Sequence, residues 1–219
     1  MDGEITTRAI LGRTLDILRP DPGPFLVVTA MLTGGSFALQ ASLPESDWNL
    51  LIEFVVLILA QYAVTKRLLK RRFGDVTGDR LAVVFAISLL STAAILFGYC
   101  ALIAPGVLLS VRWFSAIPIA LSGNLGIGDA LRKSWQTAEG HGSAVFGVLL
   151  ILYAPMIILL IAVVIASFNG DLFTAEPAPL ATVAIDAVTN LTVVTSWYAA
   201  IAFLELRIPR KTALEEVFA

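Results

Sequence analysis

Six apolar runs divide the sequence, and each is long enough, or nearly so, to cross a lipid bilayer. They extend over residues 24–41, 48–65, 81–103, 106–121, 143–168 and 180–204. At 1.5 Å per residue, about 20 helical residues span a hydrocarbon core of about 30 Å. Backbone groups in lipid must be hydrogen-bonded internally, so the runs predict helices. We therefore expect an all-α, polytopic transmembrane bundle that forms a single domain over residues 1–219.

The composition of the chain argues against two other architectures. Hydrophobic residues make up 58% of the sequence and charged residues 15%, whereas soluble domains have about 25% charged residues. A transmembrane β-barrel would show short stretches that alternate between apolar and polar residues, but the runs here are continuous. The first run lacks a small-residue cleavage pattern, so we expect a retained first helix rather than a signal peptide.

Lysine and arginine residues are distributed unequally among the loops. Fourteen of the fifteen lie in the N-terminal tail, the 66–80 loop, the 122–142 loop or the C-terminal tail, and loops 42–47 and 169–179 hold none. Cytoplasmic loops carry an excess of Lys and Arg, so six spans with both termini in the cytoplasm are predicted. A re-entrant fourth run would divide the basic loops between two sides, and we reject that topology.

Two short amphipathic segments are expected to form interfacial helices. Residues 4–19 place leucine and isoleucine side chains at helical spacing between arginines and aspartates, which is typical of a helix at the membrane surface. Residues 128–139 place Leu131 and Trp135 on one face. Trp135 suits an anchor at the membrane–water interface.

Small residues and prolines predict local features of the spans. The glycines of residues 33–36, and Ser143 with Gly147, fit close packing between helices. Bends or helix boundaries are expected at Pro105, Pro118 and Pro155.

Two stretches resemble a family of bacterial membrane proteins. The first is RAILGRTLDILRPDPGPFLVVTAML at residues 8–32, and the second is the run at residues 102–151. In the second stretch a Pro-Gly pair opens a helix, an Arg-Trp pair and another proline follow, and an Ala-Leu-x-x-Ser-Trp helix ends at glycine. Both are similar to six-helix proteins that include the membrane domain attached to some glycerophosphodiester phosphodiesterases and the YciC-like inner-membrane proteins.

The resemblance implies a six-helix fold and a location in the bacterial inner membrane. It implies little about activity, because stand-alone members of the family are mostly without an assigned function. The chain departs from the family pattern at residues 121–128, LSGNLGIG, where an acidic residue often follows the second proline. We also expect no soluble phosphodiesterase domain of the kind attached to some members.

Three ionisable residues are expected at a similar depth within the predicted spans. Glu53, Arg112 and Asp186 lie five or six residues from the periplasmic ends of the second, fourth and sixth runs. An arginine in mid-membrane costs about 2.5–3.5 kcal/mol on insertion scales, and a carboxylate partner would offset much of this. We therefore predict that Arg112 pairs with Asp186, with Glu53 nearby. Two alternatives stay open: each group extends separately to the headgroups, or the three form a substrate or proton site.

A basic cluster follows the second run directly. It consists of Lys66, Arg67, Lys70, Arg71 and Arg72. Beside a transmembrane helix such a cluster enforces topology and attracts anionic headgroups, at about 1 kcal/mol per charge. We therefore predict membrane lipids as partners and no binding of nucleic acid. A homo-oligomer or a membrane-protein partner is a further expectation.

Residues that catalysis or cofactor binding usually requires are scarce. The chain has one cysteine, Cys100, and one histidine, His141, and it contains no phosphate loop, HExxH, GxSxG or dinucleotide fingerprint. Glu205, at the end of the last run, suits solvation or local pairing. We therefore expect no catalytic residue, no metal site and no cofactor, and we expect that the protein is not an enzyme.

These observations support three functional hypotheses. The first is a non-enzymatic inner-membrane protein that acts through lipid or partner contacts in envelope or lipid homeostasis. The second is a small transporter or channel that uses Glu53, Arg112 and Asp186 as a polar site. The third, an enzyme acting on lipid, has the least support because only Glu205, His141 and scattered Ser and Thr residues are available.

Overall fold

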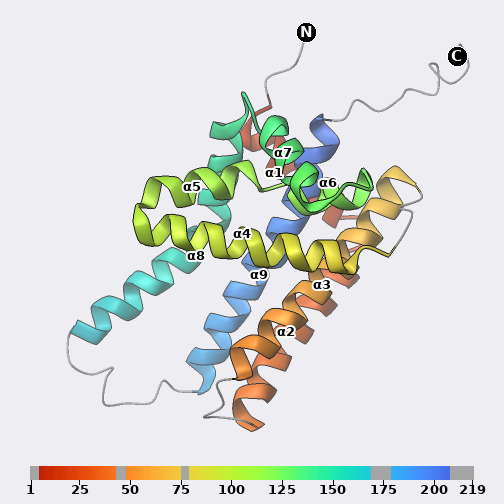
Figure 1. Cartoon of the computed structure of the whole chain (residues 1–219). Helices are drawn as coiled ribbons and strands as arrows, with labels where there is room; N and C mark the ends of the chain where they lie inside the picture. Colours follow the sequence, from red (N-terminus) through yellow and green to blue (C-terminus); the bar gives the residue numbers. More distant parts are fainter. Residues whose placement is uncertain (1–4, 43–47, 75–78, 169–178, 208–219) are drawn as a thin grey trace, which may run out of the picture.

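The computed structural model describes residues 5–42, 48–74, 79–168 and 179–207, and this part of the chain is helical without any strand (Figure 1). Its helices are α1 (Thr7–Leu18), α2 (Gly23–Ser42), α3 (Trp48–Phe73), α4 (Leu81–Ala101), α5 (Ile103–Arg112), α6 (Ala116–Ser122), α7 (Ile127–Thr137), α8 (Gly142–Phe168) and α9 (Pro179–Arg207). The predicted loop residues 43–47 and 169–178, and the tail after Arg207, lie outside the described residues.

Six helical segments are long and apolar enough to cross a membrane. They are α2, α3, α4, α8, α9 and the stretch Ile103–Ser122 that contains α5 and α6. Five of the apolar runs correspond to single helices, whereas the fourth, 106–121, is divided into α5 and α6. The all-α, polytopic class is confirmed. The helix expected over 128–139 is α7, which begins and ends within two residues of the predicted bounds.

The last helix, α9, is at the centre of the bundle. It packs against α1, α2, α3 and α8, and its residues from Trp197 to Leu204 are all buried. The helix expected over 4–19 forms as α1, but it packs into the bundle through Ile10, which is fully buried. The Oγ1 atom of Thr7 donates to the carbonyl oxygen of Ala144 in α8 at 3.1 Å.

We call one end of the bundle the basic end. It consists of α1, α7, the C-terminal turns of α3 and α9 and the first turn of α8, which lie together in Figure 1. Gly147, near the start of α8, is covered closely by Thr7 of α1, as its small-residue pattern predicted. The glycines at 34 and 35 have open space around them, so the close packing expected of this stretch is not found at these two positions.

Helices α4 and α5 form a hairpin that lies across the other long helices (Figure 1). A single extended residue, Leu102, separates the two arms. The arms touch through glycines: a Cβ atom on Gly98 would lie 2.8 Å from the backbone nitrogen of Gly106. The ring of Tyr99 covers Gly106 and would collide with any side chain there. The hairpin therefore depends on the absence of side chains at both glycines.

Both arms of the hairpin meet the rest of the protein near the basic end. Just before α4, Arg80 Nη1 donates to the carbonyl oxygen of Leu125 at 2.6 Å, and α5 ends at Arg112 beside α7. The tip is apolar and open, because Leu102 is 70% exposed and Ile103 is 73% exposed. Exposed apolar side chains of this kind are suited to lipid rather than to water.

Replacing Gly98 with alanine should separate the arms of the hairpin. The added methyl group meets backbone atoms that cannot move away, so we expect the free energy of unfolding to fall by about 1–3 kcal/mol and the melting temperature in detergent to fall with it. The matched control is Gly34→Ala, where the new Cβ atom meets nothing within 4 Å and alanine is the better helix former. Equal melting temperatures for the two variants would contradict the close approach of the arms.

Candidate functional site

Arg112 lies at the break between α5 and α6. Its guanidinium group is 5.1 Å above the ring of Trp135 in α7, and its Nη1 atom donates to the Trp135 carbonyl oxygen at 3.4 Å. The carbonyl oxygen of Arg112 accepts a 2.9 Å bond from Ser134 Oγ, which satisfies a backbone group that the helix end leaves free. An aromatic ring and a carbonyl group therefore stabilise this charge, as cation–π contacts do elsewhere.

Asp186 is hydrogen-bonded to Gln40 of α2, and one of its carboxylate oxygens is buried with no partner among the described residues. One turn further along α9, Asn190 Nδ2 donates to Thr33 Oγ1 at 3.3 Å. Polar pairs of this kind hold membrane helices together. The immediate role of Asp186 is therefore to join α9 to α2.

Arg112 does not reach either predicted carboxylate. Glu53 and Asp186 each lie nineteen residues before a member of the Arg72–Glu205 ion pair, which is about 28 Å along a helix. Both carboxylates are therefore at the end of the bundle opposite the basic end, whereas Arg112 contacts α7 at the basic end. The predicted Arg112–Asp186 pair is not formed, because α5 returns from the hairpin tip instead of starting level with α9.

A buried ion-pair network connects the helices at the basic end. The Nε atom of Arg13 in α1 donates to Glu205 Oε2 at 2.6 Å, and the Nε atom of Arg72 in α3 lies 3.6 Å from Glu205 Oε1. The Glu205 side chain is only 6% exposed. Two distant arginines thus neutralise this carboxylate, which corrects the expectation that it is solvated or paired locally.

The basic cluster after α3 is largely paired within the protein. Asp21 forms ion pairs with Arg67 and Arg71, Arg72 reaches Glu205, and Lys66 Nζ lies 4.0 Å from an oxygen of Asp79. Of the five predicted lipid-contacting residues, only Lys70 makes no ion pair with the described part of the chain. Fewer free charges are therefore available to anionic headgroups than the sequence suggests.

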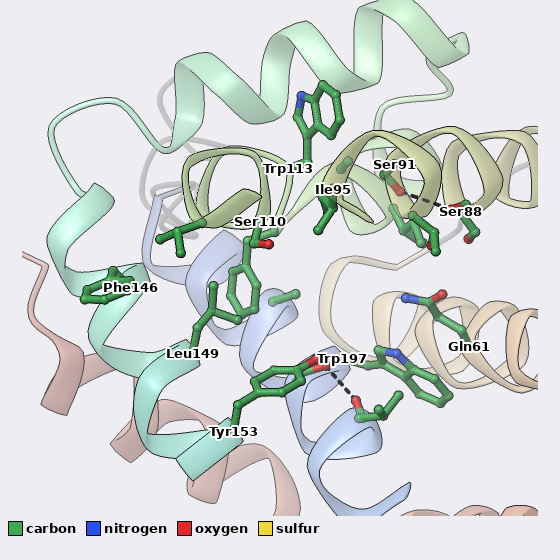
Figure 2. A pocket seen from close by; sticks show the side chains of 18 of the residues that line it. Gln61, Ser88, Ser91, Ile95, Ser110, Trp113, Phe146, Leu149, Tyr153 and Trp197 are labelled. Carbon is green, nitrogen blue, oxygen red and sulfur yellow. Dashed lines mark hydrogen bonds between the residues drawn. The ribbon is translucent and has the colours of Figure 1, made fainter. Parts of the chain in front are cut away.

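A cavity of about 770 Å³ lies between the α4–α5 hairpin and helices α3, α6, α8 and α9 (Figure 2). Its volume is within the range of about 300–1,000 Å³ that is typical of small-molecule sites. Most of the lining is apolar, with Ile95, Trp113, Phe146, Leu149 and Trp197 among its larger side chains. No residue of the lining carries a charge. The cavity is the candidate binding site of the protein.

Uncharged polar residues of α3, α4, α5, α8 and α9 line this cavity. Three serines donate to carbonyl oxygens of their own helices: Ser91 to Ile87 at 2.6 Å, Ser110 to Gly106 at 2.9 Å and Ser196 to Val193 at 2.7 Å. Ser110 Oγ also lies 3.5 Å from the Tyr99 hydroxyl group, and Ser196 is hydrogen-bonded to Tyr153. The lone pairs of the Ser91 hydroxyl group can still accept a bond. Figure 2 shows Gln61 of α3 on the same side of the cavity as Ser88 and Ser91 of α4.

Ser88 differs from the other serines of the cavity. It is 7% exposed, and its Oγ atom is buried with no hydrogen-bond partner among the described residues. A buried polar group without a partner is destabilising by about 1–3 kcal/mol. The Ser88 hydroxyl group therefore marks a position where a ligand could supply the missing hydrogen-bond partner.

Sequence reasoning missed the cavity. Serine within an apolar helix commonly bonds to its own backbone, so Ser88, Ser91 and Ser196 gave no separate signal. Only the hairpin brings them together with Gln61. Among the residues that the structure describes, no group of three His, Cys, Asp or Glu side chains could hold a metal ion.

Comparisons with protein-family models, curated proteins and solved structures gave no match for this chain. The class of the protein therefore follows from its own fold and cavity. Six apolar helices define a multi-pass helical membrane protein, and an uncharged cavity lies among those helices.

Replacing Glu205 with alanine should destabilise the bundle more than any change at an exposed carboxylate. The variant leaves Arg13 and Arg72 facing each other without a counter-ion, so we expect unfolding to become easier by about 3 kcal/mol. The control is Glu139→Ala, because Glu139 is exposed and makes no ion pair with the described residues. Melting in detergent, followed by tryptophan fluorescence, measures both. An unchanged melting temperature for the Glu205 variant would contradict the network.

Proposed function

We propose that this chain is a non-enzymatic, multi-pass protein of the bacterial inner membrane that binds a lipid in the cavity beneath the α4–α5 hairpin. The proposal rests on one observation, the uncharged cavity of about 770 Å³ among membrane-spanning helices. Through this lipid the protein would act in envelope or lipid homeostasis.

The rim of the cavity supports a lipid as the occupant. The lining residues that are exposed at the surface include Ile103 at the hairpin tip and Phe146, Leu150 and Ile157 on α8. Such side chains at membrane level contact hydrocarbon, so a molecule entering past them comes from the bilayer. A water-soluble substrate would have to cross this apolar rim. The geometry therefore favours an occupant that is itself dissolved in the membrane.

The distribution of basic residues supports an orientation with both termini in the cytoplasm. The hairpin does not change this conclusion. Whether α4 and α5 cross the bilayer twice or enter and return, they leave the following chain on the same side. The basic end then faces the cytoplasm, where Lys70 and the half-exposed Arg67 and Arg71 side chains can contact anionic headgroups.

The transporter alternative has lost its main support. It required Glu53, Arg112 and Asp186 in one polar layer, and Arg112 instead contacts Trp135. Membership of the six-helix family that the sequence resembles remains part of our proposal. Its motif residues have structural roles here, since Gly106 packs against Gly98 at the hairpin and Arg112 joins α5 to α7.

Filling the cavity should remove the bound lipid. Ile95 lines the cavity, and Figure 2 shows it within the lining, so Ile95→Trp adds bulk where the ligand would lie. The next residue, Leu96, is 62% exposed and outside the lining, which makes Leu96→Trp the matched control. We expect native mass spectrometry to show co-purifying lipid on the wild type and the control, and a several-fold loss on Ile95→Trp. Equal occupancy on all three proteins would contradict a site in the cavity.

The native cysteine reports on the position of the hairpin. Cys100 is exposed on α4, two residues before Leu102, and a thiol in hydrocarbon should not react with a membrane-impermeant maleimide from either side. We expect labelling only after detergent is added.

Controls for this labelling use the Cys100→Ser background. Lys70→Cys should react from the cytoplasmic side alone, and Ser42→Cys should react from the opposite side alone. Labelling of both positions from one side would contradict the crossing of α3.

A further inference from the structure

We infer that the ligand of the cavity is an uncharged lipid whose polar end carries hydroxyl or ester groups, and that Ser88 and Gln61 recognise this end. The inference deepens the proposed function and rests on it, since it assumes that the cavity binds lipid. It goes further by separating two classes of lipid that the membrane supplies. A phosphate-bearing lipid would belong at the surface of the basic end, and an uncharged one would belong in the cavity.

The lining argues against a charged headgroup. None of the residues that line the cavity is Lys, Arg, His, Asp or Glu. A phosphate that left water without a cationic partner would lose far more solvation energy than hydroxyl groups can return. The nearest cation along α5, Arg112, is held against Trp135. A lipid phosphate would therefore find no counter-ion in this site.

The lining offers what an uncharged polar group needs. The buried hydroxyl group of Ser88 has no hydrogen-bond partner among the described residues. It can donate a hydrogen bond to an oxygen atom of a ligand. The Gln61 amide can donate and accept. The Ser91 hydroxyl group donates its hydrogen bond to the Ile87 carbonyl oxygen, so its oxygen can accept a hydrogen bond from a hydroxyl group of the ligand. A molecule with both hydroxyl and ester groups can use all three residues.

Three polar residues of the lining lie together at one side of the cavity. Figure 2 shows Ser88, Ser91 and Gln61 at one side and Phe146 and Leu149 of α8 at the other. The polar residues labelled near Leu149, Ser110 and Tyr153, already bond to Gly106 and Ser196. A ligand with one polar end and one hydrocarbon chain would therefore place its head between α3 and α4. Its chain would extend along α8 toward the apolar hairpin tip.

Three probes with the same oleoyl chain test this assignment. Monoolein carries two hydroxyl groups and an ester, oleoyl lysophosphatidylglycerol adds a charged phosphoglycerol group, and methyl oleate lacks the hydroxyl groups. Each probe is titrated into phosphatidylcholine nanodiscs that contain the full-length protein, and occupancy is read by native mass spectrometry. We expect monoolein to bind about tenfold more tightly than either of the other probes, which corresponds to one or two hydrogen bonds.

A serine variant tests the role of Ser88. Ser88→Ala removes the unpaired hydroxyl group without adding bulk, so the fold should be kept while monoolein binding weakens about fivefold to tenfold. Binding of methyl oleate should change little. The matched control is Ser42→Ala, an exposed serine of α2 whose hydroxyl group bonds to the Ala38 carbonyl oxygen, for which monoolein binding should equal that of the wild type.

The outcomes separate this inference from the proposed function. Binding of the lysophospholipid as tight as that of monoolein would overturn the uncharged ligand but would leave lipid binding intact. Equal binding of methyl oleate, or no effect of Ser88→Ala, would overturn recognition of the polar end. If none of the three probes occupies the wild type, and Ile95→Trp changes nothing, the proposed function itself is wrong.

Discussion

The Glu205 carboxylate is the constraint on which the arrangement of the bundle depends. It is nearly removed from solvent, and Arg13 and Arg72 approach it from α1 and α3. A buried charge must be paired to be tolerated, so these three helices can meet only at one register. The Gln40–Asp186 contact fixes α2 against α9 near the opposite end. Together the two contacts hold the long helices in place independently of the hairpin.

The cavity is a geometric consequence of attaching a crosswise hairpin to this frame. Helices that cross touch along a short length and then diverge, whereas side-by-side helices can fill the space between them. The hairpin is fixed at its base, where Arg80 bonds to Leu125 and Ser134 bonds to Arg112. Its arms pack on each other through Gly98 and Gly106 rather than along α9. The space left beneath them is the candidate site.

The sequence predicted the helices well and their partners poorly. Hydropathy located the starts of α3 at Trp48 and of α4 at Leu81. An apolar run indicates side chains that are shielded from water, whether lipid or protein covers them. It could not distinguish a spanning helix from an arm of a hairpin. Nor could it pair Arg13 with Glu205, which lie 192 residues apart, or assign Arg112 to Trp135 instead of a carboxylate. Such contacts depend on which helices are neighbours in the bundle, and no local sequence pattern encodes that arrangement.

The pairing of charges at the basic end also bears on how the protein would select a lipid. Asp21 and Glu205 form ion pairs with three of the five cations of the cluster that follows α3. The cluster keeps a net positive charge, so headgroup charge is recognised at the surface. Inside the bilayer, where hydrogen bonds are stronger than in water, the unpaired hydroxyl group of Ser88 gives the cavity a basis for selection that charge does not supply. Different residues are then responsible for attraction to the membrane surface, at the basic end, and for selection of the ligand, in the cavity. The paired arginines hold the frame in place, and the uncharged cavity selects the ligand.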